Sequence, residues 1–156
     1  MIQMKPFRER VGFCGPATVK MVLEYYGVEK TERELGILMH SNEDLGTESE
    51  QMATVARQLG LDARIQDECS FHDLEKLVLE ENIPVIVNWF SEDDGHYSVV
   101  VDLDSENIYM QDPEVGYLRA MRRSHFYRIW FDFKGDTIEK KEDLILRRMI
   151  VITKKV

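Results

Sequence analysis

The spacing of apolar residues changes halfway along this chain, and this change limits the possible folds more than any other feature. In the first half, apolar residues recur at every third or fourth position, which is the period of an amphipathic helix. In the second half, Ile83–Trp89 and Tyr97–Leu103 are rich in β-branched residues, which is typical of strands. Helices followed by antiparallel strands predict an α+β fold, in which a helical N-terminal half packs on an antiparallel sheet from the C-terminal half.

Capping residues and glycines mark the expected helix boundaries. Thr31–Glu34 and Thr47–Glu50 match the capping box, in which a hydroxyl and a glutamate each satisfy a backbone N–H group. The expected helices are Ala17–Tyr26, one opening at Thr31, one running from Thr47 to Gly60, and one opening at Ser70. The expected elements of the second half are the strands Ile83–Trp89, Tyr97–Leu103, Ile108–Gln111 and Leu144–Thr153, and a short helix within Ser124–Phe133.

Length and composition favour one folded domain over residues 1–156. Apolar residues make up 44% of the chain and charged residues 31%, and no repeat or low-complexity linker divides it. The formal net charge of −9 argues against nucleic acid and against a membrane surface as partners. No apolar run approaches the ~18 residues of a spanning helix, and the N-terminus has no secretory apolar stretch, so the expected location is cytoplasmic.

The cysteines and histidines are too scattered to predict a metal site. Cys14 and Cys69 form no CxxC pair, and a reducing cytoplasm argues against a disulfide between them. His40, His72 and His125 show no zinc-ligand spacing, so we expect no metal and no cofactor. Cys69 precedes a capped helix and is interpreted as structural.

Cys14 stands at the start of the first expected helix, between Gly12-Phe13 and Gly15-Pro16. The free N–H groups and the dipole of a helix N-terminus stabilise an anion, which favours a thiolate. The neighbouring glycine allows close approach of the backbone, and a proline in the first turn costs no hydrogen bond. From position alone, a buried cysteine that fills space between helix and sheet is an equal alternative.

His96 and Asp112 complete an ordered set with Cys14. His96 follows the acidic loop Ser91–Gly95 and begins a strand, where a ring nitrogen can face a cleft. Asp112 ends the next strand, and because the hairpin doubles back, its carboxylate can lie beside His96 and fix the ring tautomer. Considered alone, His96 is consistent with a histidine on the surface or packed in the structure, and Asp112 with a residue that forms a turn before Pro113. The ordered set favours a cysteine nucleophile that a histidine activates.

Three segments resemble the motifs of the double-glycine-leader, bacteriocin-processing cysteine peptidases of the papain-like superfamily. Cys14–Gly27 is similar to the nucleophile helix of that family. Gly95–Val101 and Gln111–Gly116 look like its other two motifs, in the same order along the chain. The resemblance covers roughly Arg8–Trp130 and implies a papain-like α+β fold.

The same resemblance implies roles for individual residues. Cys14 is the nucleophile and an oxyanion donor through its backbone N–H, His96 is the general base and acid, and Asp112 orients His96. The family usually has a glutamine six residues before the cysteine as the second oxyanion donor, and Arg8 occupies that position here. Arg8 either donates through its guanidinium or pairs with a nearby acid, and the ion pair is favoured because guanidinium binds carboxylates strongly.

We therefore predict a cysteine hydrolase that cleaves a peptide or protein substrate through an acyl-thioester. Gly95 and Trp89 flank the acidic loop and are expected to line the substrate cleft, although Trp89 also fits core packing. Two alternatives stay open, namely an acyltransferase on the same scaffold and a peptide-binding domain whose catalysis is impaired at Arg8.

Overall fold

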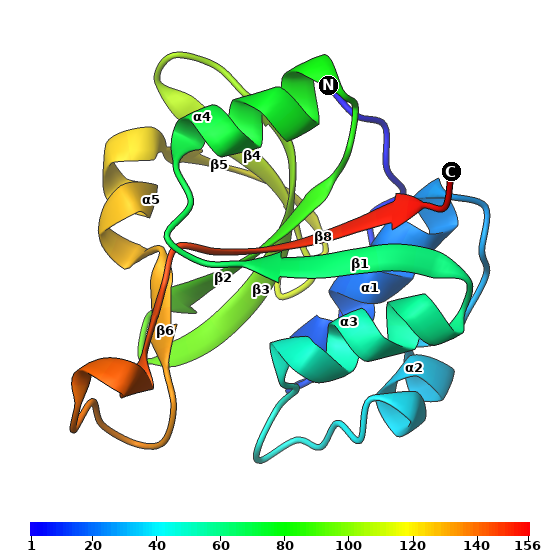
Figure 1. The fold of residues 1–156 in the computed structure, drawn as a ribbon, viewed down its shortest axis with the longest axis horizontal. Helices are drawn as coiled ribbons and strands as arrows, with labels where there is room; N and C mark the ends of the chain where they lie inside the picture. The colour runs from blue at the N-terminus through cyan, green and yellow to red at the C-terminus, as the bar shows by residue number, and fades with distance from the viewer.

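The computed structural model describes residues 1–156 and has the α+β fold that the sequence predicts (Figure 1). The helices of the N-terminal half are α1 (Cys14–Tyr25), α2 (Glu32–Leu38) and α3 (Ser49–Gln58). The later helical segments are α4 (Phe71–Glu75), the π-helical turn η1 (Lys76–Glu80), α5 (Arg123–Ile129) and the 3₁₀ turn η2 (Lys141–Asp143). The strands are β1 (Leu61–Gln66), β2 (Val85–Ser91), β3 (Asp94–Leu103), β4 (Asn107–Asp112), β5 (Tyr117–Arg122), β6 (Phe131–Phe133), β7 (Leu144–Leu146) and β8 (Arg148–Lys154).

Six strands form one antiparallel sheet in the order β1-β8-β2-β3-β4-β5. Strands β2 to β5 follow one another in the chain and pair as successive hairpins, so they bring together residues that are close in sequence. Strand β8 instead inserts between β1 and β2, which joins the C-terminal segment to both halves of the chain. Strands β6 and β7 pair separately as a two-stranded sheet.

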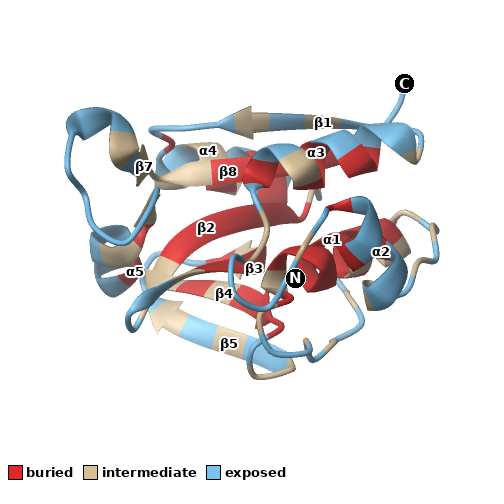
Figure 2. Cartoon of the chain, turned by 90° about the horizontal axis from the view of Figure 1, so that it is seen from below, coloured by how far each residue is buried: buried red, intermediate tan, exposed pale blue.

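The core lies where the central strands meet α1 and α3. In Figure 1, α1, α2 and α3 gather on one side of the molecule, and α4 and α5 lie on the other. Helix α1 packs on β3, and α3 packs on β1 and β8. Figure 2 shows that β2, β3 and the inner face of α1 are buried, whereas β1 and β5 at the sheet edges are largely exposed. Each fully buried Val, Leu or Ile side chain contributes roughly 1.5–3 kcal/mol.

Two strands of the six-stranded sheet, β1 and β5, lie where the sequence analysis predicted none. In β1, buried or half-buried Leu61, Ala63 and Ile65 alternate with exposed Asp62 and Arg64, a pattern that is easily missed directly after a helix. Strand β5 is mostly exposed and carries little apolar signal. Both strands are sheet edges, where pairing to one neighbour rather than burial of both faces defines the strand.

The structure also revises three expected boundaries. The capping box at Thr31 and the helix start at Ser70 are confirmed, but the capping box at Thr47 is wrong, because α3 begins at Ser49 and the Thr47 hydroxyl lies 2.6 Å from the Ser41 hydroxyl. The expected helix Ser124–Phe133 ends at Ile129, and its last residues form β6. The expected strand Leu144–Thr153 is divided into β7 and β8 at Arg147, whose φ of 47° breaks an extended backbone.

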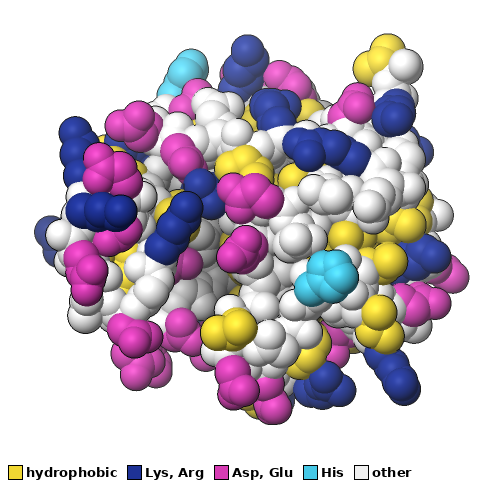
Figure 3. All heavy atoms as spheres, turned by 60° about the horizontal axis from the view of Figure 1, so that its bottom comes forward, with side chains coloured by type: hydrophobic (Ala, Val, Ile, Leu, Met, Phe, Trp, Pro, Cys, Tyr) yellow, Lys and Arg dark blue, Asp and Glu magenta, His cyan; other side chains and the backbone are white.

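Charged side chains are spread over the surface. Figure 3 shows acidic and basic side chains interspersed on one face, with apolar groups between them, so the negative net charge does not gather into one patch there. None of the helices combines the length and the apolar character that crossing a membrane requires.

Candidate active site

Cys14 is the first residue of α1, and two glycines let another segment pack closely against this helix start. A Cβ atom on Gly15 would lie 2.6 Å from Cβ of Thr47, and one on Gly12 would lie 2.9 Å from the backbone of Glu43. The loop before α3 therefore packs directly on the residues that flank Cys14. The first N–H groups of a helix have no intrahelical acceptor, so the N–H of Cys14 is suited to bind an anion.

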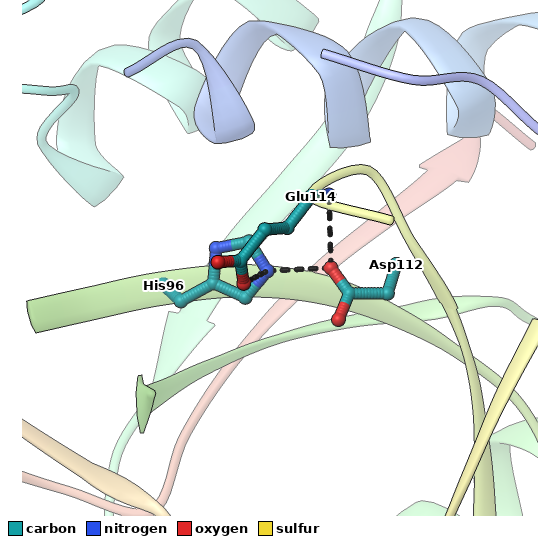
Figure 4. A group of neighbouring side chains, drawn as sticks. All are labelled: His96, Asp112 and Glu114. Atoms are coloured by element: carbon teal, nitrogen blue, oxygen red, sulfur yellow. Dashed lines mark hydrogen bonds and ion pairs between the residues drawn. The ribbon is translucent and has the colours of Figure 1, made fainter. Parts of the chain in front are cut away.

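His96 and Asp112 lie side by side on β3 and β4, as the hairpin spacing predicts. Val99 pairs with Gln111, and the same register places Asp112 diagonally from His96 on one face of the sheet. His96 Nε2 lies 2.6 Å from Asp112 Oδ1, and both side chains are buried (Figure 4). This hydrogen bond sets the tautomer of the ring and leaves Nδ1 to face another group.

Asp112 receives two further hydrogen bonds that hold it as a carboxylate. Arg119 Nη1 donates to Oδ2 at 2.9 Å, and the backbone N–H of Glu114 donates to Oδ1 at 3.1 Å. Burial alone raises the pKa of Asp112, but the bonds from His96 and Arg119 outweigh it and hold this pKa below its ordinary value. The sequence analysis missed Arg119 because it missed β5, in which Arg119 faces the same side of the sheet as Asp112.

His96 also lies near the thiol of Cys14, since the two side chains line the same cavity and Cys14 is close enough to influence the pKa of the imidazole. Burial alone lowers the pKa of His96, but the hydrogen bond to Asp112 and the neighbouring thiol of Cys14, together with the negative charges of both groups, raise it to about 10. A protonated histidine beside a cysteine stabilises the thiolate. The structure thus brings together the three residues that the sequence singled out, with His96 between the thiol and the carboxylate.

Trp89 packs behind His96 instead of lining a cleft. Its ring stands edge-on to the imidazole at 5.4 Å between centroids, and it is 1% exposed. The indole N–H donates to the Ser98 hydroxyl at 3.1 Å, and the guanidinium of Arg119 lies 5.4 Å from the indole ring. The expectation that Trp89 lines the cleft is therefore wrong, and its contribution is to support the imidazole ring from within the core.

A cavity of about 260 Å³ opens beside Cys14 and His96. Gly95 lies in its wall, and so do three carboxylates from different segments, those of Glu9, Asp94 and Glu114. The cavity is therefore polar and mainly acidic. It provides room for a substrate next to the thiol.

Arg8 lies in the same wall but forms no ion pair, so the expected pairing with a nearby acid is wrong. Its stem packs on the turn after β4, where a Cβ atom on Gly116 would lie 2.8 Å from Cβ of Arg8. The side chain is exposed. The structure thus places Arg8 at the rim of the cavity, tied to Gly116 by its stem.

Glu9 is a residue of this site that the sequence analysis did not single out. Its backbone N–H donates to the carbonyl of Pro113 at 2.8 Å, and its side chain is half-buried in the cavity wall. Burial is the main reason why the pKa of Glu9 is raised to about 7, and the charges of Glu114 and Asp112 add to this against the opposing charge of His96. No local pattern in the sequence distinguishes Glu9 from other surface acids.

Other groups around the site have structural roles. His96, Asp112 and Glu114 offer ligand atoms within 4.8 Å of one another, but His96 and Asp112 already bind each other and Arg119, so we assign no metal here. Cys69 is free and buried, donates to the carbonyl of Gln66 at 3.2 Å, and has a pKa raised to about 11, mainly by burial.

The fold and this arrangement define a class of protein, the papain-like α+β domains in which a helix-start cysteine faces a histidine on the sheet. The model of the Peptidase C39 family matches residues 9–133. The chain belongs to this family, and the resemblance drawn from its motifs is confirmed.

A related protein of Methanothermobacter marburgensis, described as uncharacterized, is 34% identical over 140 residues, which cover 87% of this chain and 89% of that protein. A second uncharacterized protein, from Methanothermobacter thermautotrophicus, is 34% identical over 117 residues and covers 75% of each chain. Neither description assigns a substrate.

Solved structures show the same fold. The peptidase domain of Streptococcus ComA, a bifunctional ABC transporter of a quorum-sensing pathway, has a TM-score of 0.73 at 20% identity, covering 99% of this chain and 100% of that domain. A double glycine motif protease from an AMS/PCAT transporter, in complex with the leader peptide, has a TM-score of 0.74 at 19% identity. The match covers 99% of this chain and 94% of that chain. At these identities the likeness shows the papain-like fold of the peptidase domains.

Proposed function

We propose that this protein is a cysteine peptidase in which Cys14, His96 and Asp112 form the catalytic triad. One observation carries the proposal: His96 shares a cavity wall with the thiol of Cys14, which influences its pKa, and it hydrogen-bonds to a buried carboxylate, Asp112, at 2.6 Å. A packed structural histidine needs no such thiol partner. The arrangement favours a thiolate–imidazolium pair, which is the reactive form of a cysteine nucleophile.

The reaction follows from these positions. The Cys14 thiolate attacks the carbonyl carbon of a peptide bond, and a bond from sulfur to carbon forms. The imidazolium of His96 gives its proton to the departing amine, which leaves an acyl-thioester on Cys14 and a neutral ring. His96 then takes a proton from water, the resulting hydroxide attacks the thioester, and the acid is released as Cys14 regains the thiolate and His96 is protonated.

Two further features suit this chemistry. The free N–H of Cys14 at the start of α1 points to an oxyanion site, and a single donor of this kind contributes on the order of 3 kcal/mol to transition-state stabilisation. Asp112 stabilises the imidazolium without leaving the carboxylate form, because Arg119 neutralises its other oxygen.

We infer that the substrate is a peptide that crosses the cavity next to Gly95. The double glycine motif protease of the AMS/PCAT transporter was solved with its leader peptide, which supports a peptide substrate for the shared fold. A peptide ending in Gly-Gly is therefore the first substrate to test, because glycine residues demand little room beside Cys14.

The first prediction tests the nucleophile. Iodoacetamide at pH 6 should alkylate Cys14 well ahead of Cys69, because His96 faces Cys14 whereas burial raises the pKa of Cys69 to about 11. Peptide mapping by mass spectrometry measures both sites in one sample. A peptidyl-Gly-Gly coumarin amide should be cleaved by the wild type and not by Cys14→Ala.

Cys69→Ala is the matched control and should retain full turnover. Equal labelling of the two cysteines, with no cleavage, would exclude the peptidase. The arginine at position 8, where the family usually has a glutamine, then favours the second candidate. This candidate is a peptide-binding domain on the same fold, which would bind the Gly-Gly peptide without cleaving it. Product analysis with an added amine distinguishes hydrolysis from acyl transfer.

A further inference from the structure

Glu9 lies in the segment before α1 and lines the same cavity as Cys14. Its carboxyl group is close enough to the backbone N–H of Phe13 for that group to influence it, so it stands next to the helix end that carries the N–H of Cys14. The backbone of Glu9 is fixed by the 2.8 Å bond to Pro113, the residue after Asp112. Glu9 is thus held between the nucleophile helix and the turn that carries the orienting carboxylate.

On the basis of the proposed function, we propose that Glu9 in its neutral acid form is the second oxyanion donor of this site. Its carboxyl O–H donates a hydrogen bond to the substrate oxygen that becomes negative when Cys14 attacks. The N–H of Cys14 donates to the same oxygen. Glu9 keeps its proton throughout, so its contribution is a hydrogen bond that strengthens in the transition state.

The surroundings of Glu9 favour the neutral acid. Burial and the negative charges of Glu114 and Asp112 raise its pKa, the charge of His96 and the N–H of Phe13 lower it, and the net result is a pKa of about 7. A carboxylic acid that its site keeps neutral can act as a hydrogen-bond donor to an oxyanion. The remaining charged side chains of the cavity wall are those of Arg8 and Asp94, and the Cys14 thiol lines the same wall.

Glu9 is better placed for this role than Arg8. Arg8 is exposed at the rim, and its stem rests against Gly116. Glu9 is half-buried and has its backbone hydrogen-bonded into the site. A preorganised donor stabilises an oxyanion more than a mobile one, because it needs no reorganisation during the reaction.

The proposal predicts a pH dependence that Glu9→Gln removes. In the wild type, kcat/KM for the coumarin amide should fall by about a hundredfold as the pH rises through about 7, because the donor becomes a carboxylate that repels the oxyanion. Glu9→Gln keeps a permanent N–H donor and should show no fall in this range. Glu9→Ala should be about a hundredfold less active than the wild type at pH 6. Glu114→Gln should move the wild-type fall to lower pH, since it removes a like charge near Glu9.

An aldehyde probe extends the test to a protein with slow turnover. Acetyl-glycyl-glycinal forms a hemithioacetal with an active cysteine, and its oxygen occupies the oxyanion site. Its affinity should weaken above pH 7 in the wild type and stay constant in Glu9→Gln. Thermal melting curves of each variant verify that it is folded.

Several results would overturn the proposal. Identical pH profiles for the wild type and Glu9→Gln exclude a donor role. A gain in activity above pH 7 that is the same in Glu9→Ala and Glu9→Gln also excludes it, because both variants then only remove the charge repulsion of a carboxylate. A hundredfold loss in Arg8→Ala with none in Glu9→Ala assigns the role to Arg8. If iodoacetamide leaves Cys14 unmodified and the aldehyde does not bind, the peptidase itself is excluded, and the role of Glu9 with it.

Discussion

At the scale of single residues, the site depends on one carboxylate, that of Asp112, which contacts two partner side chains. The carboxylate of Asp112 faces His96 with one oxygen and Arg119 with the other. The two partners differ in exposure, since the His96 side chain is 7% exposed and that of Arg119 is 35% exposed. The interaction with His96 is therefore less screened by solvent and should matter more for function.

Replacing Asp112 tests this difference. Asp112→Asn should lower kcat for the coumarin amide by roughly 10²-fold to 10⁴-fold, because a neutral amide does not stabilise the imidazolium. Arg119→Gln should lower kcat less than tenfold, since a partly exposed ion pair contributes about 1 kcal/mol or less. Steady-state kinetics on folded variants measures both.

Glu114 provides the control for this comparison. Its Oε2 lies 3.7 Å from Nε2 of His96, and Figure 4 shows its carboxylate close to the ring. If Asp112→Asn keeps full activity, Asp112 is not the orienter. The double variant Asp112→Asn, Glu114→Gln would then show whether Glu114 has taken that role.

At the scale of elements, the start of α1 is set by its contact with the loop before α3. A Cβ atom on Gly15 would lie 2.6 Å from Cβ of Thr47, which is closer than ordinary contacts allow. Tyr97, next to His96 on β3, donates to the carbonyl of Thr47 at 3.0 Å and lies 3.0 Å from the hydroxyl of Ser49. The loop thus connects the nucleophile helix to the strand of His96.

The substitution Gly15→Ala should loosen this connection. Its methyl group must displace Thr47, which should destabilise the protein by roughly 1–3 kcal/mol and slow the alkylation of Cys14. Urea unfolding and the iodoacetamide rate measure the two effects. Adding Thr47→Gly, which removes the colliding Cβ atom, should restore part of the stability and part of the alkylation rate. The single variant Thr47→Gly completes the double-mutant cycle. A Gly15→Ala protein of unchanged stability and reactivity would contradict this tight contact.

At the scale of the whole molecule, folding stability is linked to the protonation of the site. A group whose pKa is raised in the folded state binds its proton more tightly there than in the unfolded chain. The contribution of Glu9 to folding stability is complete below about pH 4.5 and is lost as the pH rises through about 7. For Asp112, whose pKa is lowered, the contribution is present above its ordinary value and is lost as the pH falls.

Glu9→Gln should therefore change stability in a pH-dependent way. Relative to the wild type, the variant should gain on the order of 1–3 kcal/mol in the free energy of unfolding between pH 4.5 and pH 8, because it no longer buries a carboxylate. Urea unfolding at the two pH values measures the gain. A difference between the two proteins that is the same at both pH values would show that Glu9 titrates alike in the folded and unfolded chains.

Much of the architecture was determined by the sequence itself. The helical period of the first half and the β-branched runs of β2 and β3 predict the α+β fold, because burial on one face of a helix or on both faces of a strand produces a regular apolar pattern. The pairing of His96 with Asp112 also follows from the sequence, since a hairpin connects them over a short distance. The position of Cys14 at a helix start is readable from the residues around it.

Only the tertiary structure decided the rest. The edge strands β1 and β5 carry weak apolar patterns, because an edge is defined by its partner strand rather than by burial. Arg119 reaches Asp112 through β5, and Glu9 reaches the cavity through its bond to Pro113, so neither contact is encoded by local spacing. The burial of Trp89 behind His96 also depends on packing, since an aromatic residue at a strand end fits a cleft or a core equally well in sequence.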